Sequence, residues 1–461
     1  MKLLWIVSGL TLSAVGIASF GRIIDKPKIE KPKSEKDALK VASLKPISKL
    51  KVPLVPTYAS HVAPILLGQC ASCHRPGEVA PFSLLTYADA KKRSQQIAQV
   101  VETGYMPPWK AAPDYGSFCG ERRLSDEQKQ ILKNWANTGE KSGVLSKSPA
   151  LPKFPVGWAK GTPDVVFEPS TTYALKADGA DVYRNFVVPT SYTEDRYVSA
   201  IEVRPGNRAI VHHVIAYLDT QGRARKLDAQ DKEPGYSTFG GVGFTPSGAL
   251  GGWAPGNETP FLPKGVGIFL PKGADIVLQV HYHTSGKPET DKTKIGVYFC
   301  KDAVDKQVRI LPLIGGLWIP PGKADFKTGG TSTIKSDVTL LNVTPHMHLL
   351  GRDMKVRAIT PDEKEIPLVH VPDWDFNWQT TYTFKEPIKV PAGTKVKMTA
   401  LYDNSTSNPR NPSSPPKQVT WGESTTDEMC IAFVSYTVDS EHLLKGEKAQ
   451  GFKNFGEKQS K

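Results

Sequence analysis

The spacing of apolar positions divides the chain into a helical part and a longer part made of strands. In residues 53–145 apolar residues recur at helical intervals, and they predict amphipathic helices at 86–104 and 125–139. Ser125 is a good N-cap for the second of these, and Gly139 is its expected end. Between about residues 160 and 440 the pattern changes to short apolar runs separated by Gly and Pro. These runs predict strands at 196–203, 209–218, 274–283, 294–300, 339–350, 395–403 and 428–436.

These elements predict a multidomain protein, in which a small α-helical domain is followed by two all-β domains. Many short strands with frequent turns are typical of β-sandwiches, and the 39 Gly and 38 Pro agree with turn-rich structure. A total of 461 residues is too long for one ordinary domain. The expected domains are helical at 53–145, and sandwiches of the jelly-roll kind at 160–315 and 316–442.

The two ends of the chain lie outside these domains. Residues 3–20 form an apolar run behind Lys2, which indicates either a signal peptide or an N-terminal membrane anchor over residues 1–22. Both alternatives place the remainder in the periplasm or outside the cell. Residues 23–52 are rich in Lys and Pro and are expected to be a linker, and residues 443–461 are expected to be a charged, mobile tail.

The net charge of +13 changes this picture little. The basic residues are spread along the chain and many fall in the linkers, so nucleic-acid binding is not expected. An acidic redox partner protein or an anionic membrane surface would fit the charge. An apolar content of 39% indicates folded domains with cores of their own.

The motif CASCH at residues 70–74 predicts covalent attachment of one haem c. Cys70 and Cys73 are spaced to form thioethers with the two haem vinyl groups, and His74 follows as the proximal iron ligand. A zinc half-site or a redox disulfide is the alternative, but zinc would need further ligands that Cys119 alone does not supply.

The second iron ligand is expected to be Met106, on a Pro-rich loop between the two predicted helices. Packing of Met106 in a core is the alternative, and His61 is a weaker candidate for the ligand. The order of a CxxCH motif, a Met loop and a C-terminal helix resembles a class I cytochrome c domain.

Six of the ten histidines fall in three close pairs, at 212–213, 281 and 283, and 346 and 348. In a strand, residues two apart point to the same face, so His346 and His348 can chelate one ion while Met347 points away. Adjacent residues point to opposite faces, so His212 and His213 share an ion only if the backbone is irregular there. Imidazole suits several transition metals, and the thioether of Met429 favours copper.

The motifs HHV, LQVHY, HMHLLG and DEMCIAF, in this order over about residues 160–440, resemble the type II copper, ascorbate-dependent monooxygenases. That family includes dopamine β-monooxygenase and the peptidylglycine hydroxylating enzyme. The resemblance implies two β-sandwiches that each hold one copper beside a shared cleft. The implied ligands are His212, His213 and His281 for the first copper, and His346, His348 and Met429 for the second, oxygen-activating copper.

The resemblance also identifies departures. The residues that would hold a substrate carboxylate in the peptide-hydroxylating enzyme are replaced here by Thr344, Ile431 and Phe433. An apolar or aromatic substrate is therefore expected. His283 has no role in the family pattern and is expected to face solvent, with indirect support of a ligand as the alternative.

Three cysteines remain after haem attachment, so at most one internal disulfide can form among them. The family resemblance implies a disulfide at Cys430, with Cys300 as the expected partner and Cys119 as the alternative.

Together these features predict an exported copper monooxygenase that hydroxylates a C–H bond with O2, with electrons supplied through its own haem. The reductant would be ascorbate or a cytochrome- or quinol-linked donor protein. The alternative is a haem–copper electron carrier, or a copper-binding protein, that oxidises no substrate.

Overall fold

The structure is a computed structural model, and it describes residues 52–155, 157–238, 241–257, 259–422 and 424–449. The expected export segment at 1–22, nearly all of the linker at 23–52 and the last part of the tail lie outside the described residues. Within the described ranges, no helix is both long enough and apolar enough to cross a membrane.

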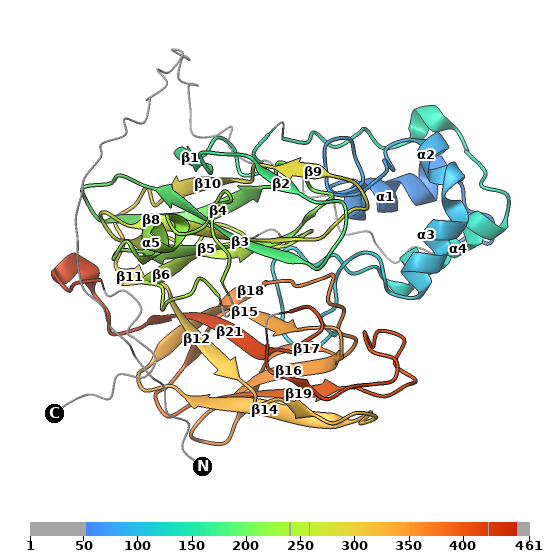
Figure 1. Cartoon of the computed structure of the whole chain (residues 1–461). Coiled ribbons are helices and arrows are strands. Elements are labelled where there is room, and N and C mark those ends of the chain that lie inside the picture. The colour runs from blue at the N-terminus through green and yellow to red at the C-terminus, as the bar shows by residue number, and fades with distance from the viewer. Residues whose placement is uncertain (1–51, 156, 239–240, 258, 423, 450–461) are drawn as a thin grey trace. The chain divides into compact units, whose positions relative to one another are not determined.

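The helical elements are short and precede the strands, except for one later helix. A π-helical turn η1 runs directly into α1, and three further helices and a 3₁₀ turn follow before the first strand (Figure 1). The bounds are η1 Tyr58–Val62, α1 Ala63–Gln69, α2 Tyr87–Lys92, α3 Ser94–Glu102, α4 Asp126–Asn137, η2 Leu145–Lys147 and, among the strands, α5 Arg223–Asp228.

The helix predicted at 125–139 is confirmed as α4, whereas the one predicted at 86–104 is divided. Ser125 caps α4 through a capping box with Gln128, and Gly139 ends the turn with a φ of +85°. Arg93 interrupts the other helix with φ −124° and ψ 16°, so that α2 ends and α3 begins there. The prediction of a single long helix was therefore wrong. At the break, the Arg93 guanidinium makes a tertiary contact with the Phe82 ring, 3.8 Å from its centroid, which a helical pattern along the chain does not encode.

The first β-sandwich has a five-stranded sheet in the order β1-β10-β4-β7-β11 and a four-stranded sheet in the order β3-β8-β5-β6, with the small pair β2-β9 beside them. Their apolar faces enclose one core, which includes Val198, Val214, Leu278 and Ile295. The strand bounds are β1 Val165–Phe167, β2 Tyr173–Leu175, β3 Val182–Pro189, β4 Arg196–Arg204, β5 Val211–Asp219, β6 Gly248–Trp253, β7 Val266–Leu270, β8 Asp275–Tyr282, β9 Glu289–Asp291, β10 Lys294–Phe299 and β11 Lys306–Gln307.

The second β-sandwich has two four-stranded sheets, in the orders β12-β21-β15-β18 and β14-β19-β16-β17, with the pair β13-β20 beside them. Its core includes Leu340, Met347, Val356 and Tyr402. The strand bounds are β12 Arg309–Ile314, β13 Trp318–Ile319, β14 Phe326–Thr333, β15 Val338–Met347, β16 Gly351–Ile359, β17 Glu365–Val371, β18 Tyr382–Val390, β19 Lys395–Tyr402, β20 Val419–Thr420 and β21 Cys430–Val438. The seven strands predicted from the sequence all form.

The border between the sandwiches lies earlier than the expected position at 315/316. Strand β11 pairs with β7 of the first sandwich, whereas β12 already pairs with β21 of the second. The chain therefore changes sandwich at Val308. The charged tail begins with a 3₁₀ turn, Leu443–Lys445, whose first amide donates to the carbonyl of Asp305 at 3.0 Å.

The loop between α3 and α4 packs against the second sandwich. The Ala112 amide donates to the His370 carbonyl at 2.7 Å, and the Cys119 amide donates to the Thr383 carbonyl at 2.8 Å. Trp109 meets the ring of Tyr382 edge-on, with centroids 5.2 Å apart. The helical part and the second sandwich are thus joined by backbone hydrogen bonds as well as by the covalent chain.

Candidate metal centres

The first histidine group lies on two neighbouring strands of the first sandwich. His212 and His213 come from β5, and His281 comes from β8, where it is paired directly with His213. The register between the strands shifts between Val211 and His213. This bulge answers the question raised by two adjacent histidines, because an extra residue in a strand redirects a side chain that regular alternation would send to the other face.

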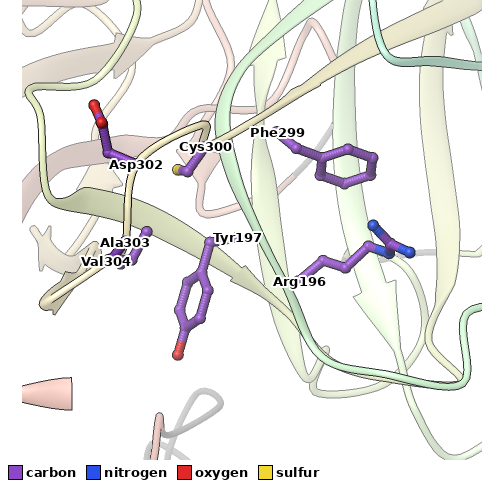
Figure 2. Close-up of a pocket in the computed structure, with 7 residues that line it drawn as sticks. All are labelled: Arg196, Tyr197, Phe299, Cys300, Asp302, Ala303 and Val304. Carbon is purple, nitrogen blue, oxygen red and sulfur yellow. The ribbon is translucent and has the colours of Figure 1, made fainter. Parts of the chain in front are cut away.

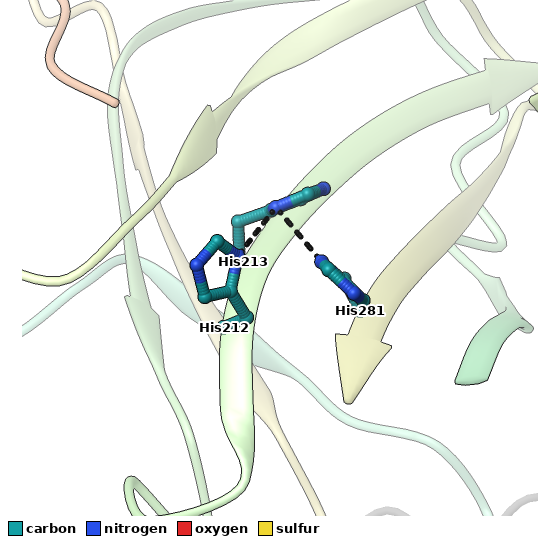
Figure 3. A group of neighbouring side chains, drawn as sticks. All are labelled: His212, His213 and His281. Carbon is teal, nitrogen blue, oxygen red and sulfur yellow. Dashed lines mark hydrogen bonds between the residues drawn. The ribbon is translucent and has the colours of Figure 1, made fainter. Parts of the chain in front are cut away.

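The ring nitrogens of this group converge (Figure 3). His213 Nδ1 lies 3.2 Å from His212 Nδ1 and 3.4 Å from His281 Nδ1. Three nitrogens at the usual ~2.0 Å from one ion would be separated by about 3.5 Å in a trigonal arrangement. One atom of each of the three residues lies within 4.8 Å of the others. The three imidazoles thus fit a single metal ion.

Asp181, which the sequence analysis did not identify, orients this group. Its carboxylate accepts from His281 Nε2 at 3.0 Å, so the Nδ1 atom of His281 is left to face the other histidines. His283 is not simply solvent-facing as expected: its side chain is 43% exposed, but Nδ1 lies 2.5 Å from the same carboxylate. Thr425, from the second sandwich, donates a further hydrogen bond to Asp181 at 2.6 Å. An acidic residue that stands before a strand carries no pattern that would have marked it in the sequence.

The second histidine group lies where β15 meets β21. His346 pairs with Ile431 and Met347 pairs with Cys430. Met347 is fully buried in the core, as expected for the opposite face, and the rings of His346 and His348 are 5.2 Å apart. Met429 directly precedes β21, and its carbonyl accepts from the Tyr402 hydroxyl at 2.6 Å. The strand register brings the expected HxH pair and the expected methionine to the same end of the sheet.

Both histidines of the second group present Nε2 for a metal. His346 Nδ1 is 2.7 Å from the side-chain oxygen of Gln379, and His348 Nδ1 is 3.1 Å from the carbonyl of Asp427. Since both partners are acceptors, each Nδ1 carries the proton and each Nε2 keeps its lone pair. The two groups therefore differ, with Nδ1 atoms converging in the first and Nε2 atoms available in the second.

Glu428 holds the turn that carries the second group, although sequence reasoning assigned it no role. Its carboxyl oxygens accept from the amides of His348 at 2.8 Å and Leu350 at 2.6 Å. Burial raises the pKa of Glu428 to about 8, despite these and further hydrogen bonds from backbone amides. These hydrogen bonds connect the residues that follow β15 with the residues that precede β21.

Burial keeps the histidines neutral, which is the form that binds metal. Burial first, and neighbouring imidazoles second, lower the pKa of His212 and His346 to about 3. Burial lowers the pKa of His348 to about 4, and it lowers that of His213 well below its ordinary value. For Asp181, burial alone would raise the pKa, but hydrogen bonds from His281, His283 and Thr425 outweigh it and hold the pKa far below its usual range.

One aromatic ring lies between the two groups. Phe376 of the second sandwich stacks on His212, with centroids 4.8 Å apart and planes 18° apart. The same ring meets His348 edge-on at 5.6 Å. The two histidine groups therefore face each other across Phe376, which the sequence did not single out.

The CxxCH segment forms a turn directly after α1. Cys70 is the C-cap of α1, and the amide of His74 donates to the Cys70 carbonyl at 2.9 Å. His74 Nδ1 is 3.2 Å from the carbonyl of Phe82, so Nδ1 carries the proton and Nε2 is left for an iron ion. Burial, followed by the nearby Cys73, raises the pKa of Cys70 to about 12. The donor set fits a covalently attached haem.

Met106 lies on the loop between α3 and α4, as expected, and is partly buried. Its amide donates to the Val100 carbonyl at 3.0 Å, which ties the loop to the end of α3. His61, the weaker candidate, has its Nδ1 3.0 Å from the amide of Thr57 at the start of η1. The ligand role of Met106 stays a prediction.

The expected disulfide is not formed. All five cysteines lie in the described part of the chain, and none of them is disulfide-bonded there. Cys430 is fully buried in the second sandwich, whereas Cys300 follows β10 of the first sandwich and contacts the Val266 carbonyl. The prediction was wrong because Cys430 lies in the core of the second sandwich, whereas Cys300 is half-buried beside a surface cavity of the first.

A surface cavity of about 240 Å³ occurs in the first sandwich beside Cys300 (Figure 2). Its lining residues are Arg196, Tyr197, Phe299, Cys300, Asp302, Ala303 and Val304. None of the expected metal ligands is among them. This cavity is therefore separate from both histidine groups.

A comparison with known protein families matches the part of the chain that carries the second histidine group. The family model for the C-terminal domain of copper type II ascorbate-dependent monooxygenases matches residues 307–449. This range contains His346, His348 and Met429, and its start coincides with the change of sandwich at Val308. Copper is therefore the metal that the comparisons support.

Curated relatives match a longer part of the chain than the family model does. Human DBH-like monooxygenase protein 1 is 24% identical over 276 residues, which cover 54% of this chain and 43% of the human protein. The chicken protein of the same name is 24% identical over 274 residues, covering 54% and 43% of the two chains. MOXD1 homolog 1 of Drosophila melanogaster is 23% identical over 202 residues, covering 40% and 28%.

The chain thus spans less than half the length of the curated relatives it matches. Among solved structures, a two-domain protein of unknown function from Bacteroides fragilis covers 58% of this chain and 93% of its own, with 8% identity and a TM-score of 0.15, which supports no argument. The family model and the curated relatives show that this chain is similar to copper monooxygenases.

Proposed function

We propose that this chain is an exported copper monooxygenase that hydroxylates a C–H bond of an apolar organic substrate with O2, and that its own haem c supplies electrons. The observation that carries the proposal is the facing of the two histidine groups across Phe376. One group offers three converging nitrogens, and the other offers two Nε2 atoms at the end of the sheet where Met429 precedes β21. Similarity to copper monooxygenases supports the same function.

In this proposal His212, His213 and His281 hold one copper, and His346, His348 and Met429 hold the other. The bound coppers would supply one-electron redox chemistry with O2 for insertion of oxygen into a C–H bond. The protein contributes orientation: Asp181 fixes the ring of His281, and Gln379 and the Asp427 carbonyl fix the rings of the second group. Neutral, buried imidazoles avoid a proton barrier to binding the metal.

The surroundings of His346 support an apolar substrate. Ile431 is paired with His346, and Phe433 is paired with Thr344, so these side chains lie on the same face of the sheet. Phe433 is 37% exposed there. The Thr344 hydroxyl is engaged with Thr381 at 2.9 Å. Since no basic side chain stands at these three positions, a substrate carboxylate would find no ionic partner at them.

The haem proposal is supported by the CxxCH geometry and by the free Nε2 of His74. An external reductant, either ascorbate or a cytochrome- or quinol-linked donor protein, would reduce the haem. Export to the periplasm or the outside is required for this arrangement, and the apolar run at residues 3–20 would serve as signal or as membrane tether.

Metal content and oxygen consumption test the proposal. We expect about two coppers per haem in the copper-reconstituted protein, and Met429→Leu should lower the copper content toward one because a thioether ligand is lost while the volume is kept. O2 uptake by the reduced protein should rise when small apolar or aromatic compounds are supplied. Trp318→Leu, at a side chain that is 67% exposed on the same sandwich, is the matched control.

The alternative is a haem–copper electron carrier. It predicts the same metal content but no increase of O2 uptake with any organic compound, and no oxygenated product by mass spectrometry. Copper content near zero in protein with intact haem would contradict both proposals for the histidine groups.

A further inference from the structure

The loop between β17 and β18 touches every candidate redox centre except the CxxCH motif. We call residues 372–381 the bridging loop. It carries Phe376, Trp378 and Gln379 within four positions. Phe376 lies between the two histidine groups, and Gln379 is bonded to His346. Trp378 contacts the helical part of the chain.

Trp378 meets the residue that precedes the predicted iron ligand Met106. The ring of Tyr105 lies edge-on to the ring of Trp378, with centroids 6.0 Å apart and planes 67° apart. Tyr105 is 43% exposed, and its ring packs against that of Trp378. The segment that would present Met106 to the haem is thus in van der Waals contact with the bridging loop.

This contact is held in place by the docking of the loop that follows Met106. Lys110 Nζ lies 3.0 Å from the Asp373 carboxylate, at the start of the bridging loop. The Lys385 amide donates to the Ser117 carbonyl at 2.9 Å, beyond the end of the bridging loop. Contacts on both flanks therefore hold the Tyr105–Trp378 pair, which is the geometric condition for reproducible electronic coupling.

Trp378 is also connected to the second histidine group, through the peptide bond to Gln379 and the hydrogen bond between Gln379 and His346. Gln379 follows Trp378 directly, and its side-chain oxygen is 2.7 Å from His346 Nδ1. Its side-chain nitrogen donates to the Phe376 carbonyl at 3.2 Å, which fixes the amide in this orientation. The imidazole of a predicted copper ligand is thereby linked to the indole ring.

We propose that Tyr105, Trp378 and Gln379 form the path by which electrons pass from the haem to the copper held by His346. The inference rests on the proposed function, because it requires a haem at Met106 and a copper at His346. One electron leaves Fe(II), which becomes Fe(III), and reduces Cu(II) to Cu(I); no bond is formed or broken. The external reductant, of the ascorbate class in the test below, restores Fe(II).

The helical part also contacts the first sandwich, through an ion pair. Glu78 pairs with Arg208 and, at 3.4 Å, with Arg204 of the first sandwich. Glu78 is four residues beyond His74, and Arg208 is four residues before His212. This ion pair therefore lies between the CxxCH segment and the first histidine group, not the second.

The test is the rate of intramolecular electron transfer in the full chain loaded with haem and copper. A photosensitiser reduces the haem in the absence of O2, and haem absorbance then follows its reoxidation by Cu(II), with loss of the Cu(II) EPR signal as a second readout. We expect Trp378→Leu to slow reoxidation by an order of magnitude or more, and Trp378→Phe to restore part of the rate. Tyr105→Leu, at a half-exposed position, should slow it as well.

Controls separate the path from the fold and from the proposed function. Trp318→Leu removes an exposed tryptophan of the same sandwich and should leave the rate unchanged. Copper content, the haem spectrum and its midpoint potential should be the same in all variants. If both metals bind and Trp378→Leu transfers electrons as fast as wild type, or if Arg208→Ala is the slow variant, the path is overturned while the proposed function stands. Absence of haem or copper from the wild-type protein would overturn both.

Discussion

At the residue scale, the candidate ligands depend on a few acceptors that the sequence did not mark. His281 directs Nδ1 toward its neighbours because Nε2 donates a hydrogen bond to the Asp181 carboxylate. In His346 and His348 the Nε2 atom is left for a metal instead, because Gln379 and a backbone carbonyl accept hydrogen bonds from their Nδ1 atoms. The identity of the free nitrogen is set by these acceptors, and they are therefore the first residues to change.

Replacing Asp181 should weaken copper at the first group alone. Asp181→Asn keeps the shape but removes the charge that orients His281, and loss of such support lowers metal affinity by about 10–100-fold. Competition titration with a copper chelator would measure the affinity, with the second group as an internal reference. Asp178→Asn, at an exposed carboxylate in the same loop, is the control. Equal affinities for Asp181→Asn and wild type would contradict the orienting role.

At the element scale, the second group depends on the junction of β15, β16 and β21. Glu428 precedes Met429 and accepts from the amides of His348 and Leu350. Trp374 Nε1 donates to the His348 carbonyl at 3.1 Å from the other side. The ligand-bearing turn is thus held by hydrogen bonds from two segments that are distant in sequence.

Removing the Glu428 carboxyl should destabilise this junction. Glu428→Ala leaves two buried amides without an acceptor, which costs about 1–3 kcal/mol for each. Glu428→Gln keeps an acceptor oxygen and should lose less. Urea unfolding of the metal-free protein gives the free energies without a contribution from copper. A Glu428→Ala variant as stable as Glu428→Gln would show that the carboxyl does not support the turn.

At the scale of the whole molecule, several buried histidines couple stability to pH. In the metal-free protein the pKa values of His212 and His346 are about 3 and that of His348 is about 4, whereas an unfolded chain has histidine pKa values of about 6.5. Between about pH 4 and 6.5 the unfolded chain binds more protons at these residues, so stability rises with pH. Glu428 has the opposite effect on the pH dependence of stability, because its pKa in the folded protein is raised to about 8. Its contribution is that of one group, whereas three histidines act in the other direction.

The free energy of unfolding of the metal-free protein should therefore fall as pH decreases from about 6.5 to about 5, by up to about 1.4 kcal/mol per pH unit for each histidine. Urea titrations at several pH values would measure it. His346→Gln removes one of the three groups and should flatten the dependence. A stability that is independent of pH over this window would contradict the burial of neutral imidazoles.

Local signals along the chain were enough to predict the secondary structure and the residue types of the candidate site. Alternation predicted the strands, Ser125 and Gly139 predicted the limits of α4, and the paired histidines with Met429 predicted the two groups, because these signals depend on residues close in the chain. Adjacent histidines left one question open, which the bulge in β5 answers.

The distant residues that support the candidate ligands are identified by the folded chain and not by its sequence pattern. Asp181, Gln379 and Glu428 act through contacts with residues 100, 33 and 80 positions away, as Asp181–His281, Gln379–His346 and Glu428–His348. The fold also separated Cys300 from Cys430 and brought Phe376 between the histidine groups. Such contacts follow from how sheets pack and which loops meet at their ends, and no spacing along the chain encodes them.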